Sequence, residues 1–287
     1  MPLTINSSIA SLNAHRSLRN NTSALSKTFA RLSSGLRINS ASDDAAGLAM
    51  SAKLKAAVLS TNAAVRNNND GISMMQVADA ALAETSTALQ RIRELAVQSN
   101  TTTMSGTDQN NLQLEVTELM AEIQRISTTT EFNNMDLLDG SFSTTKAIFQ
   151  IGADAGQTMV AAITSAGADS IGASTGTAAN GISVGSAAYD GGYISTTIDN
   201  LDIAIDSVSA IRAQIGAYQN RFESAVNSLS AISEATETAR ARIVDADIAA
   251  ETSKMTRLSI LQQAGVAVLA QANQQPAIAY RLLDSLK

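Results

Sequence analysis

Both ends of the chain consist of long segments in which apolar residues recur at helical spacing and glycine and proline are almost absent. These segments cover residues 1–60 and 200–275 and are rich in alanine, leucine and serine. The middle, residues 141–198, differs because it holds nine of the sixteen glycines and only four charged residues. Chain termini are usually the least ordered parts of a protein. A chain that is most regular there is typical of a subunit that assembles with others.

Composition limits how such a chain can pack. Its 287 residues are enough for a large core or two domains, but aromatic residues make up only 3% and tryptophan is absent. Large aromatic side chains supply much of the volume of ordinary cores. Packing must therefore rely on Ala, Leu, Ile and Val between closely spaced helices. The absence of cysteine excludes disulfides and thiolate metal sites, and it fits both a cytosolic and an extracellular protein.

Charge and hydropathy exclude further classes of protein. The net charge of −6 argues against nucleic acid as the main partner. No apolar run reaches the roughly 18 residues of a membrane span, so no membrane insertion is expected. The N-terminus lacks a basic region followed by an apolar core, so we expect no cleavable signal peptide. If the protein is secreted, it leaves the cell by another route.

Periodicity predicts two long helices in the N-terminal part of the chain. The first covers about residues 5–32 and stops at a Ser-Ser-Gly sequence, because glycine readily takes the conformation that ends a helix. The second begins at Ser42, a favourable N-cap, and can continue to residue 100 with a weak point at 67–71. At 1.5 Å per residue this helix would be about 80 Å long. Few compact domains contain such a helix.

Three further helices are predicted from the same kind of spacing. Thr107 caps the third helix, whose apolar residues follow the alternating four-three spacing of a coiled-coil seam. The fourth repeats this spacing over residues 201–232. The last helix covers about 245–272, and its final turns are apolar around most of their circumference, so a single partner cannot cover them. Pro276 is expected to break the pattern.

Between the helical parts the period changes from helical to alternating. Residues 148–165 alternate apolar and polar side chains around a glycine-containing turn, which predicts a β-hairpin within a region of about 132–165. Residues 166–195 are rich in Gly, Ser, Ala and Thr, with little to bury except Tyr189 and Tyr193. We expect a short, irregular, surface-exposed lobe there.

Catalytic and cofactor motifs are missing from the sequence. His15 is the only histidine, and without a second histidine or any cysteine a transition-metal site or a Ser–His–Asp triad is not expected. Asp43 and Asp44 fit the start of a helix better than a site for a hard metal ion. Neither the glycine-rich nucleotide motifs nor H-E-x-x-H occurs. We expect no enzyme activity, no metal and no cofactor.

Two segments allow more than one interpretation. Arg91, Arg93 and Glu94 lie on the long helix, either on a solvated face with intrahelical ion pairs worth a few tenths of a kcal/mol each or in an interface where Arg and Leu anchor a partner. Chemistry alone favours the solvated face. The Ser- and Thr-rich stretch at 143–198 fits either a plain loop or a platform for O-linked sugars.

Long motifs at both ends of the chain are shared with a known family. RLSSGLRINSASDDAAGLA at 31–49 resembles the N-terminal signature of bacterial flagellin, and ARIVDADIAAETSKMTRLSILQQAGVAVLAQANQQP at 241–276 resembles the C-terminal signature. QRIRELAVQ at 90–98 and FQIGADAGQ at 149–157 follow in the family's order. The chain is identified as a member of this family, in a short form whose outer domains are nearly absent.

The resemblance implies a mainly α fold in which the long terminal helices form a coiled coil in the filament core. The next helices form an elongated bundle with a small β-hairpin region, and a short irregular central lobe faces outward. The corresponding domains are 1–42 with 243–287, 43–165 with 196–242, and the lobe 166–195. Such a chain would build a thin and comparatively smooth filament.

The resemblance also implies a structural subunit that is exported unfolded by the flagellar type III route and polymerises outside the cell for motility. Expected partners are other copies of the chain, the flagellin export chaperone, which binds the last helix, the flagellar cap and hook-junction proteins, and the Toll-like receptor for flagellin. The residues expected in the polymerisation core are Ile5, Ile9, Leu12, Leu25, Phe29, Leu32, Leu258, Leu261, Val268 and Leu269.

A second set of residues matches the segment that the Toll-like receptor recognises in the family. In the family's filaments the same helix packs against adjacent subunits, so the two roles are compatible. The tail after Pro276 departs from the family's usual ending and contains Tyr280 and Arg281. The expected receptor and inter-subunit residues are Gln90, Arg91, Arg93, Glu94, Leu95 and Gln98.

Two rival functions fit the residues less well. The hook–filament junction protein shares the terminal sequence character, but the segments SASDDAAGLA and LAQANQQP favour the filament subunit. A surface adhesin that binds polysaccharide through the central lobe would need stacking aromatic side chains, and only Tyr189 and Tyr193 are available there.

Overall fold

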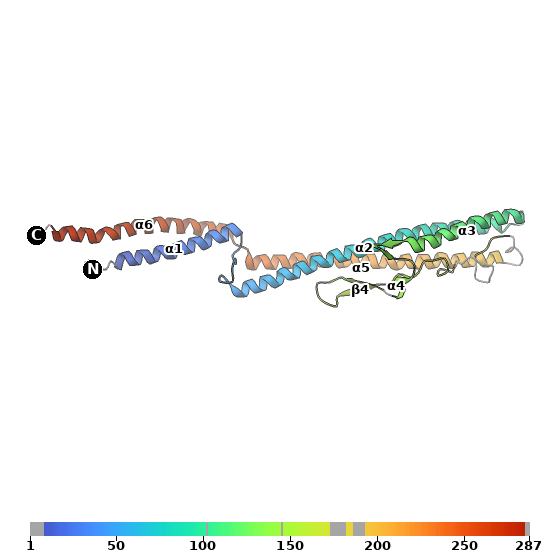
Figure 1. Cartoon of the computed structure of the whole chain (residues 1–287), viewed down its shortest axis with the longest axis horizontal. Helices are drawn as coiled ribbons and strands as arrows, with labels where there is room; N and C mark the ends of the chain where they lie inside the picture. The colour runs from blue at the N-terminus through green and yellow to red at the C-terminus, as the bar shows by residue number, and fades with distance from the viewer. Residues whose placement is uncertain (1–8, 102, 145, 173–181, 186–192, 285–287) are drawn as a thin grey trace. The chain divides into compact units, whose positions relative to one another are not determined.

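The computed structural model describes residues 9–101, 103–144, 146–172, 182–185 and 193–284 (Figure 1). Its elements confirm the predicted fold class, since long helices dominate and the strands form two small antiparallel pairs. In chain order the elements are α1 (Ile9–Ser34), α2 (Ala45–Ser99), α3 (Gly106–Thr129), β1 (Glu131–Phe132), β2 (Met135–Asp136), α4 (Ser141–Thr144), β3 (Ala147–Gln150), β4 (Thr158–Ala161), α5 (Tyr193–Val244) and α6 (Ile248–Asp284).

The chain divides into two compact units. Unit 1 consists of Met1–Val58 and Ala235–Lys287, and unit 2 is the continuous stretch Leu59–Glu234. Helices α2 and α5 contribute residues to both units. The finer division of the chain into three domains, proposed from the resemblance, stays a prediction.

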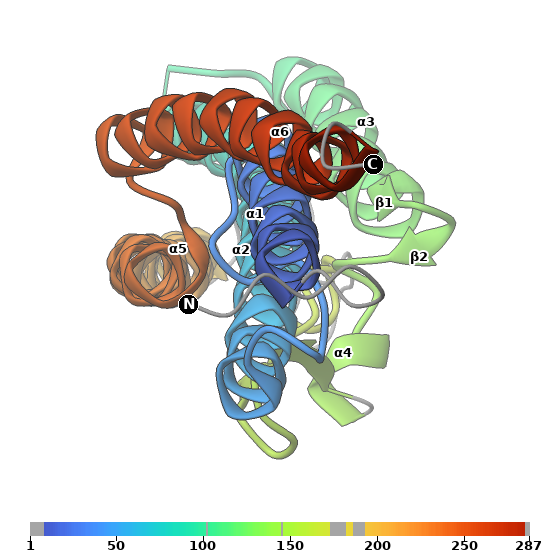
Figure 2. The same ribbon diagram turned by 90° about the vertical axis from the view of Figure 1, so that its left-hand side faces the viewer.

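In unit 1 the helices α1 and α6 lie side by side and run in opposite directions (Figures 1 and 2). Near one end of the pair the Ser11 hydroxyl donates to Asn273 Oδ1 at 2.8 Å, and near the other end Arg31 Nη1 donates to Glu251 Oε1 at 3.3 Å. The two connecting segments also meet, because Leu36 and Asp245 form an antiparallel bridge. The predicted pairing of the terminal helices is therefore present within one chain.

Two helix starts differ from the prediction. The N-cap of α2 is Asp44 rather than Ser42, since Asp44 Oδ1 accepts from the Gly47 amide at 2.9 Å. The N-cap of α3 is Ser105 rather than Thr107, and Ser105 and Asp108 form a reciprocal capping box. In both cases a favourable cap residue lies within two positions of the one expected.

Neither the predicted weak point of the second helix nor Pro276 of the last helix interrupts its helix. Helix α2 runs without a break through 67–71, and α6 continues beyond Pro276 to Asp284, so the prediction that Pro276 ends the helix is wrong. A proline inside a helix removes only one backbone donor, and the turns on either side keep theirs. At 67–71 the polar side chains have partners outside the helix: Asn67 Nδ2 donates to the Gln150 carbonyl at 3.3 Å, and Asn68 Nδ2 reaches the Ile151 carbonyl at 3.4 Å.

The predicted hairpin is confirmed, and it has a smaller neighbour. Strands β3 and β4 pair antiparallel from Ala147↔Ala161 to Gln150↔Thr158. Strands β1 and β2 are joined by Asn133 and Asn134, whose φ angles of 51° and 60° are those of the tight two-residue turns that suit a twisted hairpin. Asparagine tolerates this left-handed conformation better than most residues. The Asn133-Asn134 pair is therefore the sequence feature from which this turn could have been predicted.

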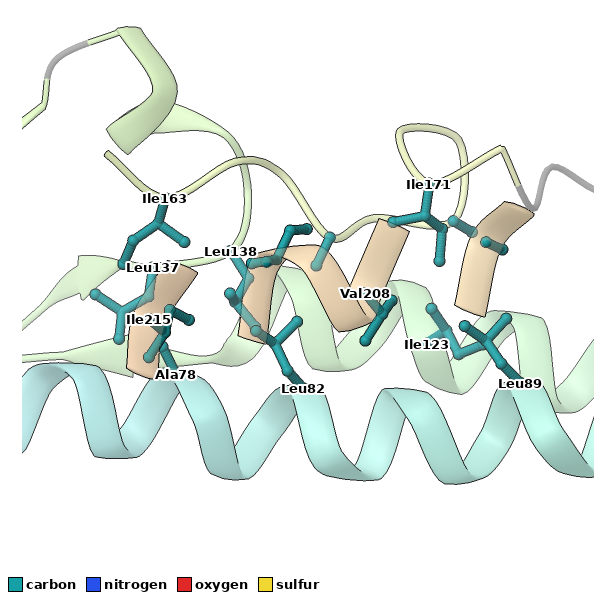
Figure 3. Close-up of a cluster of buried hydrophobic side chains, with 14 of the residues drawn as sticks. Ala78, Leu82, Leu89, Ile123, Leu137, Leu138, Ile163, Ile171, Val208 and Ile215 are labelled. Carbon is teal, nitrogen blue, oxygen red and sulfur yellow. The ribbon is translucent and has the colours of Figure 1, made fainter. Parts of the chain in front are cut away.

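The core of unit 2 lies between α2, α3 and α5 and the segment that follows α3 (Figure 3). Leu82 and Leu89 of α2 meet Ile123 of α3 and Val208 of α5 there (Figure 3). Aliphatic and methionine side chains supply most of its volume, and Phe222 is the largest fully buried side chain. This agrees with the packing expected from a chain poor in aromatic residues.

Part of the expected surface lobe is buried, which corrects the prediction that it has little to bury. The glutamine side chains of α3 hold it in place: Gln113 Oε1 accepts from the Val184 amide at 2.6 Å, and Gln124 Oε1 accepts from the Ala168 amide at 3.1 Å. Tyr189 lies outside the described residues, as does the side chain of Tyr193. The buried apolar residues of the segment are Ala166, Ala168, Ile171, Ile182 and Val184.

Candidate functional site

The seam between α1 and α6 is built largely from small and polar residues. Gly265 faces Leu18 there, close enough that an added Cβ would lie 3.5 Å from Leu18 Cδ1. Among the less exposed positions of each helix, one series alternates in steps of three and four, as in a coiled coil. The series is Ser11, Ala14, Leu18, Asn21, Leu25, Thr28 and Leu32 on α1, and Glu251, Met255, Leu258, Gln262, Gly265, Leu269 and Ala272 on α6, and Ala24, Arg31, Thr252 and Ser259 lie beside it.

Large apolar side chains lie outside this seam. Ile9 is 65% exposed and Val268 60% exposed in the single chain. Large apolar side chains that gather uncovered on the outside of a helix pair indicate a site of interaction. We call this set the outer apolar face. It consists of Ile9, Leu12 and Phe29 on α1 and Ile260, Leu261, Val266 and Val268 on α6.

The ten residues expected in the polymerisation core therefore fall into different environments. Leu258 is buried in the seam, and Leu25, Leu32 and Leu269 are partly buried. Ile5 lies outside the described residues. Ile9, Leu12, Phe29, Leu261 and Val268 belong to the outer apolar face, which Ile260 and Val266 extend. Helical spacing alone could not separate the two groups, because α6 is apolar on several sides.

The segment 90–98 of α2 presents a charged face in unit 2. Arg91 Nη2 lies 2.9 Å from Glu115 Oε1 of α3, and its Nη1 donates to Glu94 Oε2 at 3.1 Å. Arg93 Nε donates to Asp202 Oδ1 of α5 at 2.7 Å. Only the Arg91–Glu94 pair is intrahelical, so the expected solvated face also ties α2 to two neighbouring helices.

These ion pairs shift the pKa values of the side chains that form them. The hydrogen bond from Arg93 lowers the pKa of Asp202, and the hydrogen bond with Glu115 raises the pKa of Arg91. All these side chains are about half exposed, so their contribution to stability is small. As the pH falls, the lowered pKa means that Asp202 loses its charge, and with it the pair with Arg93, at a lower pH than an unpaired aspartate would.

The remaining residues of the segment lie on two sides of the helix. Gln90 and Gln98 are exposed, and Val97 beside them is a half-exposed apolar residue. Leu95 is 1% exposed and belongs to the core of unit 2, so it supports the helix from within. The structure thus offers a surface of two arginines and two glutamines on a rigid helix.

The described part of the chain contains no group of three or more His, Cys, Asp or Glu residues placed to hold a metal ion. Within the same residues, none of the helices combines the length and the apolar content required to cross a bilayer.

Comparison with known proteins gives matches to both the N-terminal and the C-terminal part of the chain. Family models described as the bacterial flagellin N-terminal and C-terminal helical regions match residues 5–143 and 198–283. The chain is 42% identical to a flagellin of Bacillus subtilis and 42% identical to one of Halalkalibacterium halodurans, in each case over 97% of this chain and 99% of the relative.

A solved structure, described as a putative flagellar hook-associated protein from Vibrio parahaemolyticus, covers 71% of this chain and 100% of its own with a TM-score of 0.57. At 12% identity this likeness shows the fold alone. The two family models and the whole-length identity to flagellins carry the assignment. The chain belongs to the bacterial flagellin family.

Proposed function

We propose that this flagellin is the structural subunit of an extracellular flagellar filament and polymerises through α1 and α6. The outer apolar face is the observation that supports the proposal. Burying one large apolar side chain contributes about 1.5–3 kcal/mol, and this face has seven such residues uncovered in the single chain. Other copies of the chain would cover them.

The weak seam supports the second part of the proposal, which is export in an unfolded state. Of the fourteen seam positions only six are leucine or methionine, and small or polar residues such as Ser11, Asn21 and Gly265 occupy the others, so the pair gains less from burial within one chain than a fully apolar seam would. Such helices order fully only when a partner surface is present. By resemblance to the family, we further propose that the export chaperone binds α6 and that cap and hook-junction proteins contact the assembled subunits.

A repeated contact between two different faces of the subunit produces an open polymer when its rotation does not close. The hook–filament junction protein is the alternative within the same fold. The 42% identity to flagellins over nearly the whole chain favours the filament subunit, whereas the likeness to a hook-associated protein is limited to the fold.

Electron microscopy of the purified chain after salting-out or seeding tests the proposal. We expect long, uniform filaments, because every added subunit covers the outer apolar face of its neighbours. Short capped assemblies would point to the junction protein. A chain that stays soluble under every seeding condition would contradict a role as filament subunit.

We also propose that the exposed residues of 90–98 are recognised by the Toll-like receptor for flagellin. Arg91 and Arg93 are half exposed and held in place by Glu115 and Asp202 on neighbouring helices, so a partner would meet them without further ordering. Since arginine is common among the residues that dominate binding, the Arg91→Ala variant should lose about 30-fold in potency in a receptor reporter assay of the monomer.

Arg125→Ala is the matched control, since Arg125 is a similarly exposed arginine of unit 2 that pairs with Glu122 on α3. It should leave potency unchanged, and filaments should signal less than monomers because the helix packs against its neighbours there. Equal potency of the wild-type monomer and Arg91→Ala, or no response to the wild-type monomer, would refute receptor recognition at this segment.

A further inference from the structure

Three charged side chains meet in unit 1 where α1 ends, α6 begins and the connector between α1 and α2 passes. Arg31 Nη1 donates to Glu251 Oε1 of α6 at 3.3 Å, and Arg31 Nη2 lies 3.6 Å from Asp43 Oδ1 of the connector. The arginine side chain is 23% exposed and both carboxylates are 13% exposed. One guanidinium thus joins the end of α1 and the connector that follows it to α6, which lies 220 residues further along the chain.

The connector, residues 35–44, is itself an ordered element. Its backbone pairs with the segment that precedes α6, since the Arg37 amide donates to the Val244 carbonyl at 2.6 Å and the Ala246 amide donates to the Gly35 carbonyl at 2.9 Å. Ile38 is 4% exposed. Asp43 organises the turn, because its Oδ2 accepts from the Ser40 amide at 3.2 Å.

This cluster differs from the other ion pairs of unit 1. Glu237 and Arg240 pair within a single helix and gain little. Lys254 approaches Glu251 at 3.9 Å but is half exposed. Arg31 Nε and Glu251 Oε2 are buried without a hydrogen-bond partner in the described structure. Arg31 is therefore the main compensation for the Glu251 carboxylate, while Asp43 also accepts hydrogen bonds from the Ser40 hydroxyl and amide. Because both carboxylates share one guanidinium, losing either contact leaves the other less well held.

We propose that Arg31, Asp43 and Glu251 form a latch that couples the pairing of α1 and α6 to the ordering of the connector. Once Glu251 of α6 fixes the Arg31 side chain, the contact with Asp43 costs less conformational entropy. The reverse holds when Asp43 binds first, because coupling between two contacts is reciprocal. Ordering of the terminal helices therefore also orders the segment that leads into α2.

Amide hydrogen exchange measured in filaments tests this latch. The test rests on the proposed function, because filaments are where we expect α1 and α6 to be fully ordered. Glu251→Gln leaves every contact of Asp43 in place, yet the amides of residues 36–43 should exchange about tenfold faster than in the wild type. Asp43→Asn should accelerate exchange in the first turns of α6 by a similar factor. In the double variant, the acceleration of exchange in each region should be smaller than the product of the accelerations that the two single variants cause there.

Glu237→Gln is the matched control, because it removes the exposed pair with Arg240 in the same unit and should change neither region. Variants that do not assemble alone are incorporated as a minority into wild-type filaments. Effects confined to the substituted segment, or no protection of residues 36–43 in the wild type, would overturn the latch. A wild-type chain that forms no filament contradicts the proposed function instead, and the same exchange is then compared in the soluble chain.

Discussion

Deletion of residues 243–287 is expected to abolish polymerisation while unit 2 remains folded. The deletion removes α6 and with it Ile260, Leu261, Val266 and Val268, which form more than half of the outer apolar face. It also exposes the seam of α1 and removes the backbone partners of the connector. At about 1.5–3 kcal/mol for each buried side chain, the four residues together account for roughly 6–12 kcal/mol, which is comparable to the whole binding free energy of a contact of about micromolar affinity.

Sedimentation and electron microscopy measure this loss, and amide exchange at Leu82 and Ile123 shows whether unit 2 is intact. Unit 2 keeps its own core, which includes these two residues. A single substitution gives a graded version of the same test. Phe29→Ala should raise the critical concentration about 30-fold, the factor that corresponds to about 2 kcal/mol. Filaments formed by the truncated chain would place the polymerising surface elsewhere.

Phe222→Ala is expected to destabilise unit 2 by about 3–5 kcal/mol, the range for a large aromatic side chain removed from a core. Phe222 of α5 is fully buried, and its ring meets that of Phe149 of β3 edge to face, with centroids 5.2 Å apart. It also lies against Gly71 of α2. One ring therefore joins two helices and the hairpin, and urea denaturation followed by far-UV circular dichroism measures its loss.

Two helical glycines provide a matched pair around this ring. A Cβ at Gly71 would lie 2.7 Å from Phe222 Cζ, whereas a Cβ at Gly216 of α5 would have no neighbour within 4 Å. Gly216→Ala should therefore stabilise by about 0.5–1 kcal/mol. Gly71→Ala should destabilise by about 1 kcal/mol, since overpacking outweighs the gain in helix propensity. In the Phe222→Leu background, where the side chain is smaller, Gly71→Ala should cost less stability than in the wild type. Equal effects of the two alanines, or a larger cost of Gly71→Ala in the Phe222→Leu background, would argue against this packing.

The helices were predictable because their apolar spacing is local information. The spacing that predicted the helix over 201–232 is found in α5, and the alternation at 148–165 is found in β3 and β4. The exact caps were less predictable, since Ser42, Asp43 and Asp44 are all acceptable cap residues. Asp44 takes that place in the structure, while Asp43 is engaged by the turn before it.

Features that depend on distant partners could not be read from the sequence. The sequence of 166–172 and 182–185 predicts a surface segment, but Gln113 and Gln124 of α3 accept hydrogen bonds from its backbone at Val184 and Ala168. The polar run at 67–71 looks like a break in α2, yet it holds the carbonyl groups at the end of β3. In each case one segment supplies the hydrogen bonds that another needs.

The sequence identifies the apolar and charged residues of the terminal helices and of 90–98, but not how these side chains are arranged. Leu258 and Leu261 are equivalent by hydropathy, but the first lies in the seam and the second on the outer apolar face. The pairs of Arg91 and Arg93 with other helices depend on tertiary packing that no local pattern contains. Local spacing identifies the apolar residues of a helix, and only the neighbouring helices determine which of them remain uncovered.

The anchoring of the central segment by α3 has a consequence for the length of the chain. Ile171 and Ile182 are buried and fix two points of the backbone on the core of unit 2. The closure entropy of a segment between two fixed points rises only with the logarithm of its length, so doubling the length costs about 0.6 kcal/mol. Insertions between Ile171 and Ile182 would therefore cost little free energy of folding. The chain can lengthen between these two anchors without any change in the core of unit 2.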